Sequence, residues 1–250
     1  MLGELYKPKG LALETAQAVL ETENAYAVNV AVGCTNKCLY CYVPKFLRKS
    51  TDKCCLIRLP KNNPADLVKC QLDKGLKPDG VFLSFLTDPL LPENRQATYE
   101  VSMALWQAQV KKIAVLSKIN TTERAFIRHG MTIVSLDNKF HKSFEPNTTS
   151  PLQRLKMLEL WKAAFNSYVW VSMEPYPPSE IYKQNFETLL EQLSFVDFIV
   201  FGMWNYDARA RTEKAKQEYA ENIAVLQDFC KQNTIRFHVK SDTLKASQSL

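Results

Sequence analysis

Short apolar runs alternate along the chain with longer segments that have helical periodicity. The runs are rich in β-branched and aromatic residues and lack the polar–apolar alternation of a half-solvated sheet, so they predict strands buried on both faces. These runs cover residues 25–32, 81–85, 112–117, 131–135, 168–173, 198–202 and 235–240.

Helices are predicted between these strands, and several open with a Ser, Thr or Pro start signal. They cover residues 64–74, 93–110, 122–129, 150–166, 179–193 and 212–231. Alternating strands and helices imply βαβ units with right-handed crossovers, and therefore a parallel α/β sheet that is either open or curled into a barrel. Six or seven such repeats favour the barrel.

Length and composition indicate how many domains the chain forms and in which cellular compartment it works. The chain has 250 residues, of which 46% are hydrophobic, enough for the core of one domain. No opening stretch has the order of a signal peptide, and no apolar run approaches the roughly 20 residues that span a bilayer. We therefore expect a cytoplasmic protein without a membrane partner.

Charge and cysteine content narrow the chemistry. A net charge of +6 is modest for this length and lysines are scattered along the chain, so a nucleic-acid partner is allowed but not indicated. Seven cysteines in a reducing compartment do not suggest a disulfide framework. Their odd number and their clustering point to metal or redox chemistry.

Polar residues follow the apolar runs. In a parallel barrel the loops after the strands converge on one mouth, where the chemistry takes place. The residues in these positions are Cys34, Thr87, Asp88, Lys118, Ser135, Glu174, Trp204, Asn205 and Lys240. The alternative is structural, because strand ends also carry turn caps, such as Thr87 and Asp88 before Pro89, and solvated or barrel-closing groups.

Three of the cysteines, Cys34, Cys38 and Cys41, lie within eight positions. A structural zinc site or an electron-transfer cluster normally uses four protein ligands, so a set of three leaves one place for a small molecule. An iron without a protein ligand can bind an amine and a carboxylate. The alternative is a zinc site completed by a histidine or by one of Cys54, Cys55 and Cys70.

The three cysteines, with Tyr40 before the last of them, resemble the C-x3-C-x-aromatic-C signature of the radical S-adenosylmethionine superfamily. Further segments are similar to the spore photoproduct lyase-like (DNA repair photolyase-like) branch, from "PKGLALE" before the first long strand to the "FHVK" that ends at Lys240. They are "TDPLLPE" at 87–93, "SKIN" at 117–120, "VSLDN" at 134–138 and "EPNTTSPLQRL" at 145–155. One departure is Leu86, where the lyase has a hydrogen-donating cysteine.

The resemblance implies a fold and a cofactor. The fold is a partial (β/α)6-type TIM barrel of parallel strands with outer helices, in a single domain over 1–250. Its parts would be a lead-in over 1–24, the barrel over 25–240 and a tail over 241–250. A 4Fe-4S cluster would be held by Cys34, Cys38 and Cys41, with S-adenosylmethionine chelating the fourth iron through its amine and carboxylate.

The resemblance also assigns roles to other residues. Tyr40 would line the adenine side, Thr87 and Asp88 would lie near the bound cofactor, and Ser135 would contact its ribose or methionine part. Lys118 would bind the carboxylate, and Arg154 is a second candidate for the same group. The side chains left for the substrate are Glu174, Trp204, Asn205 and Lys240.

The implied reaction starts with an electron from a low-potential donor such as flavodoxin or ferredoxin. Reductive cleavage of S-adenosylmethionine gives a 5'-deoxyadenosyl radical, which abstracts hydrogen from an unidentified substrate, for which nucleic acid and protein are candidates. One alternative keeps the fold but transfers a methyl or aminocarboxypropyl group. Another is a non-catalytic zinc or iron–sulfur protein that binds nucleic acid through a basic surface.

Overall fold

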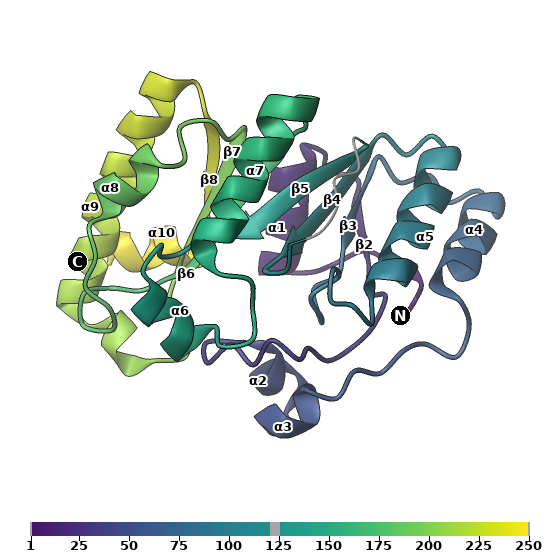
Figure 1. Cartoon of the computed structure of the whole chain (residues 1–250), viewed down its shortest axis with the longest axis horizontal. Coiled ribbons are helices and arrows are strands. Elements are labelled where there is room, and N and C mark those ends of the chain that lie inside the picture. The colour runs from purple at the N-terminus through teal and green to yellow at the C-terminus, as the bar shows by residue number, and fades with distance from the viewer. Residues whose placement is uncertain (1, 121–125, 250) are drawn as a thin grey trace.

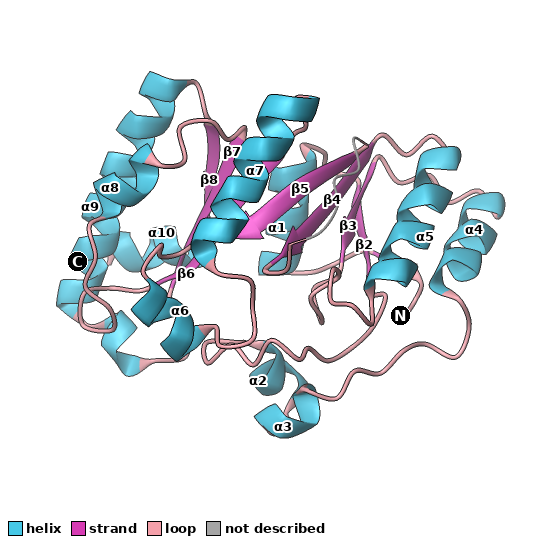
Figure 2. Ribbon diagram, in the orientation of Figure 1, coloured by secondary structure: helices cyan, strands magenta, loops and turns pink. Residues whose placement is uncertain are grey.

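The fold is described from a computed structural model, which covers residues 2–120 and 126–249. Within these residues, one sheet runs in the order β1 to β8 along the chain (Figures 1 and 2). The strands are β1 (Leu5–Tyr6), β2 (Ala25–Val28), β3 (Gly80–Leu83), β4 (Lys112–Ser117), β5 (Ile127–Thr132), β6 (Val169–Tyr176), β7 (Phe198–Met203) and β8 (Arg236–Val239). β1 is antiparallel to β2, and all later neighbours are parallel. β1 and β8 remain edges, so the barrel is open.

Helices cover the outer face of this sheet in two groups. Val68 and Leu105, from the group near β3 and β4, pack with Val81. Leu158 and Leu226, from the group near β6 and β7, pack in a second core cluster. The first group is α4 (Pro64–Asp73) and α5 (Arg95–Gln107), and the second is α7 (Pro151–Phe165), α8 (Phe186–Glu191) and α9 (Glu213–Asn233).

The opposite face is covered by α1 (Leu11–Leu20), which sequence analysis did not predict. Ala16 and Val19 of α1 share a core cluster with Ala27, Phe82 and Val200, which come from strands on both sides of the open barrel. α1 contacts β2, β3, β4 and β7. Small inward side chains on β2 leave room for a helix, so α1 fills the space that a closed barrel would fill with side chains.

The remaining helices lie in loops that follow strands. They are α2 (Val43–Leu47) and α3 (Thr51–Cys54) after β2, α6 (Asn138–Phe144) after β5, the 3-10 helix η1 (Ala208–Arg211) after β7, and α10 (Ser241–Gln248) after β8. Figure 1 shows α2 and α3 together at the lower edge of the view, apart from the helices that flank the sheet. None of the described helices has both the length and the apolar character needed to cross a membrane.

The predicted fold class is confirmed, and one predicted helix is wrong. Residues 122–125 of the predicted helix 122–129 lie outside the described residues, but the residues from Ile127 to Thr132 form β5. The strand predicted at 131–135 therefore begins earlier and ends at Thr132. The polar residues that obscured it have specific partners: the Arg128 guanidinium donates to the Val19 carbonyl and lies 4.3 Å from the Tyr168 ring centre.

The helix predicted over 179–193 is also shorter in the structure, where only Phe186–Glu191 is helical. Asn185 caps its first turn, because its side-chain oxygen accepts a hydrogen bond from the Thr188 N–H at 2.9 Å. Upstream, the backbone and hydroxyl of Ser179 donate to Glu218 on α9 instead. A side chain from another element therefore holds this segment in an irregular path.

Candidate functional site

A cavity of about 320 Å³ lies where the carboxyl ends of the strands converge. It brings together most of the residues that the sequence singled out, because loops after different parallel strands meet at this end of a barrel. The predicted residues that line it are Cys34, Cys38, Tyr40, Cys41, Thr87, Asp88, Lys118, Glu174, Asn205 and Lys240. Ser135, Arg154 and Trp204 are not among its lining residues.

The cysteine loop joins β2 to α2 and begins at Gly33. Gly33 has a φ of 102°, and a Cβ atom there would lie 2.3 Å from the Leu56 carbonyl oxygen. Only glycine permits this approach of two backbones. The Cys34 N–H then donates to the Cys54 carbonyl at 2.8 Å, which fixes the start of the loop against the end of α3.

The thiols of this loop are buried among backbone donors. Burial, together with the nearby Asp88 charge, raises the pKa of Cys34 to about 11. Burial raises the pKa of Cys38 to about 12. The nearby backbone N–H groups of Asn36 and Asp88 oppose the rise in the pKa of Cys34, and that of Val43 opposes the rise in the pKa of Cys41. Such N–H donors stabilise thiolate charge and are a known influence on the potential of iron–sulfur clusters, so this donor set fits a cluster.

The structure gives less support to a site for a single metal ion than to a cluster site. Among the described residues, no three His, Cys, Asp or Glu side chains converge in a way that could hold one ion. A cubane cluster does not need such convergence, because each cysteine binds a different iron. All seven cysteines of the chain are free thiols in the structure.

Asp88 connects the loops around the cavity. One carboxylate oxygen accepts from Ser117 Oγ at 2.6 Å and from the Leu90 N–H at 3.0 Å. The other accepts from Asn36 Nδ2 and from the Lys118 N–H, both at 2.9 Å. Asp88 therefore holds the cysteine loop, the loop after β3 and the end of β4 together.

Thr87 has a similar position. Its hydroxyl donates to the Gly33 carbonyl and accepts from Asn94 Nδ2, the latter at 2.8 Å. Because both bonds run to protein groups, the Thr87 hydroxyl fixes the glycine at which the cysteine loop starts. Thr87 and Asp88 thus line the cavity while their polar atoms hold its wall in place.

Lys118 presents a positive charge to the cavity. Its ammonium lies 5.3 Å from the centre of the Tyr40 ring, and among the described residues it makes no side-chain hydrogen bond or salt bridge. Burial alone would lower its pKa, but the neighbouring acidic groups of Cys38, Glu145 and Asp88 raise the pKa above its ordinary value. Lys118 is therefore a protonated lysine without a paired anion, which suits it to bind a carboxylate.

Tyr40 is held from behind by a buried charge pair. Its hydroxyl donates to Glu145, which also forms an ion pair with Arg154, and both charged side chains are 1% exposed. Arg154 donates further to the Thr132 carbonyl at 2.5 Å. The Trp204 ring packs edge-on against Tyr40, with centroids 5.1 Å apart. Arg154 and Trp204 thus support the cavity wall from outside it.

Ser135 also lies behind the cavity wall. It is three residues beyond the end of β5 and is 1% exposed. Its hydroxyl accepts a hydrogen bond of 3.2 Å from the Asp137 N–H, a local turn contact. The strand ends earlier than the sequence suggested, and Ser135 is not among the residues that line the cavity.

The wall formed by β6 and β8 carries a second charge pair. Lys240 Nζ lies 3.1 Å from Glu174 Oε2, and the Lys240 side chain is 7% exposed. Burial raises the pKa of Glu174, although Lys240 opposes this shift. Gly202 on β7 leaves the space, since a Cβ atom there would lie 2.8 Å from Glu174 Cγ. Glu174, Asn205 and Lys240 form the wall contributed by the last strands.

Some residues of the site were not singled out from the sequence. Asn36 is 3% exposed, lines the cavity and has a buried Oδ1 without a hydrogen-bond partner in the described part of the chain. Cys54 and Cys55, which the sequence offered only as alternative zinc ligands, also line the cavity. For Glu145, the position next to Pro146 in a family-like segment was a usable signal. For Asn36, the only usable signal was its place inside the cysteine loop.

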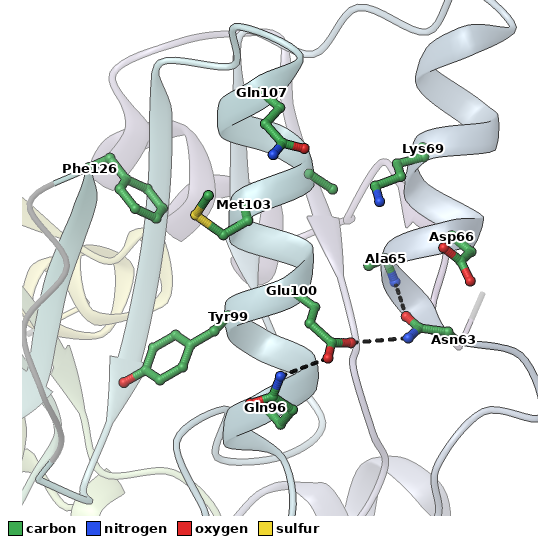
Figure 3. A pocket seen from close by; sticks show the side chains of 11 residues that line it. Asn63, Ala65, Asp66, Lys69, Gln96, Tyr99, Glu100, Met103, Gln107 and Phe126 are labelled. Atoms are coloured by element: carbon green, nitrogen blue, oxygen red, sulfur yellow. Dashed lines mark hydrogen bonds between the residues drawn. The ribbon is translucent and has the colours of Figure 1, made fainter.

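A second hollow of about 460 Å³ lies between α4 and α5 (Figure 3). Polar side chains that line it already bond one another. Glu100 accepts from Asn63 at 3.0 Å and from Gln96 at 2.7 Å. Since these groups satisfy each other on an outer helix surface, the candidate site is the cavity at the strand ends.

No protein-family model matches the chain. The uncharacterized protein ORF301 of Acidianus two-tailed virus is 24% identical over 212 residues, which are 76% of this chain and 70% of that protein.

Two solved structures of SuiB from Streptococcus suis share the architecture. The structure bound to S-adenosylmethionine has a TM-score of 0.61 and 13% identity, over 96% of this chain and 57% of SuiB. A further SuiB structure also gives 0.61 and 13%, over 96% of this chain and 56% of SuiB. The chain thus spans little more than half the length of SuiB, and the likeness establishes a common fold.

Proposed function

We propose that this chain is a radical S-adenosylmethionine enzyme, related to the spore photoproduct lyase-like branch, that acts on a substrate held against the wall of Glu174 and Lys240. One observation carries the proposal: Cys34, Cys38, Cys41 and the unpaired Lys118 line a single cavity at the strand ends. The fold around that cavity is shared with a SuiB structure bound to S-adenosylmethionine.

The three cysteines would hold a 4Fe-4S cluster and leave one iron for S-adenosylmethionine. When bound, this pair of cofactors supplies an electron and a 5'-deoxyadenosyl radical that abstracts hydrogen. The residues of the chain place the cofactor: Lys118 binds its carboxylate, and the buried Asn36 Oδ1 is an acceptor for its amino group. Tyr40 lines the adenine side.

In this proposal, other predicted residues act indirectly, by positioning loops and side chains of the site. Thr87 and Asp88 fix the loops, while Arg154 positions Tyr40 through Glu145. Ser135 holds the turn before α6. Leu86 has no thiol that could donate a hydrogen atom where the lyase has a cysteine, so we do not propose the photoproduct lyase reaction. We further propose a cytoplasmic setting, consistent with the free thiols, and an electron donor such as flavodoxin or ferredoxin.

Anaerobic reconstitution tests the cluster. The wild-type protein should be brown with about four irons per chain, and alanine at Cys34, Cys38 or Cys41 should abolish the colour. Cys70→Ala is the matched control, because Cys70 is an exposed free thiol on α4. A colourless protein with one zinc would instead support the non-catalytic metalloprotein.

The reaction is tested with dithionite and S-adenosylmethionine. Formation of 5'-deoxyadenosine by the reconstituted protein is the expected result. A full cluster that yields none would overturn the proposed activity. Methylthioadenosine or S-adenosylhomocysteine as the product would favour aminocarboxypropyl or methyl transfer on the same fold.

A further inference from the structure

The net positive charge of the protein is concentrated in one segment beside the cavity. The chain has 32 basic and 26 acidic side chains, a net charge of +6. Residues 37–61 contain seven of the basic and one of the acidic side chains, so they account for all of the net charge. The basic residues are Lys37, Lys45, Arg48, Lys49, Lys53, Arg58 and Lys61. The rest of the chain is neutral, although lysines occur throughout it.

This segment, here called the basic segment, is presented to solvent. All seven cations are exposed, and none forms a salt bridge with another residue that the structure describes. The segment includes α2 and α3, which project from the body of the molecule in Figure 1. Pro44, Thr51 and Lys37 of the segment line the cavity. Unpaired cations at the mouth of a site attract anionic partners and raise their association rate.

Apolar side chains are interleaved with these cations. Phe46 is 65% exposed, Leu56 is 67% exposed and Leu39 is 71% exposed. Across the mouth, the Tyr206 ring is 52% exposed, and Lys45 Nζ lies 4.3 Å from its centre. Proteins that bind single-stranded nucleic acids combine these two elements, cations for the phosphates and exposed aromatic rings on which bases stack.

We propose that the basic segment binds a single-stranded stretch of nucleic acid and places one nucleotide at the cavity mouth. The cysteines lie inside the cavity, so a base stacked in a duplex cannot reach them, whereas an unpaired base can. Glu174, Asn205 and Lys240 on the far wall offer hydrogen-bond donors and acceptors to such a base. The claim that the bound strand is also the substrate rests on the proposed function. The claim that the basic segment binds the strand does not.

An acidic electron-donor protein would also be attracted to this charge. The aromatic rings favour nucleic acid, because Tyr206 comes from the loop after β7 and flanks the opening rather than the outer side of the cysteine loop. A donor needs only proximity to a cluster, and has no use for an exposed ring such as Tyr206 at the entrance. Binding of an electron-donor protein to the basic segment, in place of nucleic acid, is therefore one of the outcomes that the experiment distinguishes.

Binding is measured by fluorescence anisotropy with the reconstituted protein and no S-adenosylmethionine. The probes are a labelled single strand of about 15 nucleotides, as DNA and as RNA, and the corresponding duplexes. The triple variant R48E/K49E/K53E should weaken single-strand binding by at least about tenfold and reduce the slope of log K against log salt by about 2. Phe46→Ala should weaken binding about tenfold while leaving the slope unchanged.

The control is a triple variant with the same change in charge, K74E/K77E/K111E. These exposed lysines precede β3 and β4, at the opposite ends of the strands, and binding should change by less than about twofold. Equal losses in the two triple variants, or tighter binding of the duplexes, would overturn the proposal. The proposal would also be overturned if single strands did not bind and if flavodoxin, but not dithionite, reduced the cluster more slowly in the first variant than in the wild type. Formation of 5'-deoxyadenosine tests the proposed function separately.

Discussion

The Asp88 carboxylate accepts a hydrogen bond of 2.9 Å from the Asn36 side chain, which joins the loop after β3 to the cysteine loop. The same carboxylate also accepts from Ser117 Oγ and from the Lys118 N–H. A single buried group thus fixes the relative positions of the cysteines and of the lysine across the cavity. A change at Asp88 should disturb the folded protein even before any cofactor binds.

Asp88→Ala should lower the free energy of unfolding of the cluster-free protein by about 3 kcal/mol, because buried donors lose their acceptor. Urea unfolding followed by circular dichroism measures this loss. Ser117→Ala, which removes one of these bonds, should cost about 1 kcal/mol. If Asp88→Ala unfolded at the wild-type midpoint, Asp88 would not be the residue that holds these loops.

The pair of Glu145 and Arg154 gives a prediction about stability and pH. Despite burial, which alone would raise it, Arg154 and Lys118 hold the pKa of Glu145 below its ordinary value of 4.5. A carboxyl group with a lowered pKa stabilises the folded state above its unfolded-state pKa and loses that contribution as the pH falls through the folded-state value. Wild-type stability should therefore decrease below about pH 4.5.

Glu145→Gln should be less stable than the wild type at pH 7 by about 3 kcal/mol, since it leaves the Arg154 charge buried without a partner. Its stability should also fall less steeply in acid. Unfolding curves of both proteins at pH 7 and pH 4 make the comparison. Parallel losses between these two pH values would show that Glu145 is not the group that titrates.

Sequence patterns sufficed for the parallel sheet because its strands are apolar on both faces. They failed at β5, where Arg128 and Gly130 interrupt the apolar run and the partners of Arg128 come from distant residues. They also missed α1, whose apolar face is recognisable only when β2 and β7 are seen to enclose it. Long-range packing decided both elements.

The residues of the candidate site also fall into two groups: those whose position follows from the strand ends, and those whose position depends on long-range packing. Strand-end position predicts that Cys34, Lys118 and Lys240 lie close together, and all three line one cavity because parallel strands end together. Position alone could not reveal that Arg154 faces Glu145, since that depends on how α7 packs on the sheet. The concentration of charge in residues 37–61 is readable from the sequence, but its exposure at the mouth becomes visible only in the fold.

Glu174 and Lys240 provide a double-mutant test of the far wall. Lys240→Met should lower the free energy of unfolding by about 2 kcal/mol because it leaves the Glu174 charge uncompensated. The double variant Glu174→Gln with Lys240→Met should recover most of that loss. As a more exposed comparison, Lys162→Met, which removes the cation paired with Asp197 at 2.6 Å, should cost less than about 1 kcal/mol. Additive losses at Glu174 and Lys240 would show that the two side chains do not interact.

Lys118 tests how the cavity holds its cofactor. The ammonium has no anionic partner within salt-bridge distance in the described residues, yet it stays protonated, so a ligand carboxylate can supply the missing charge. Lys118→Met should weaken S-adenosylmethionine binding about 10- to 100-fold by calorimetry, while iron content stays at the wild-type level. Lys118→Arg should restore part of the affinity, because the charge returns with a different shape. A Met variant that binds as tightly as the wild type would mean that the carboxylate is held elsewhere, and a loss of iron in the same variant would mean that Lys118 serves the cysteine loop instead.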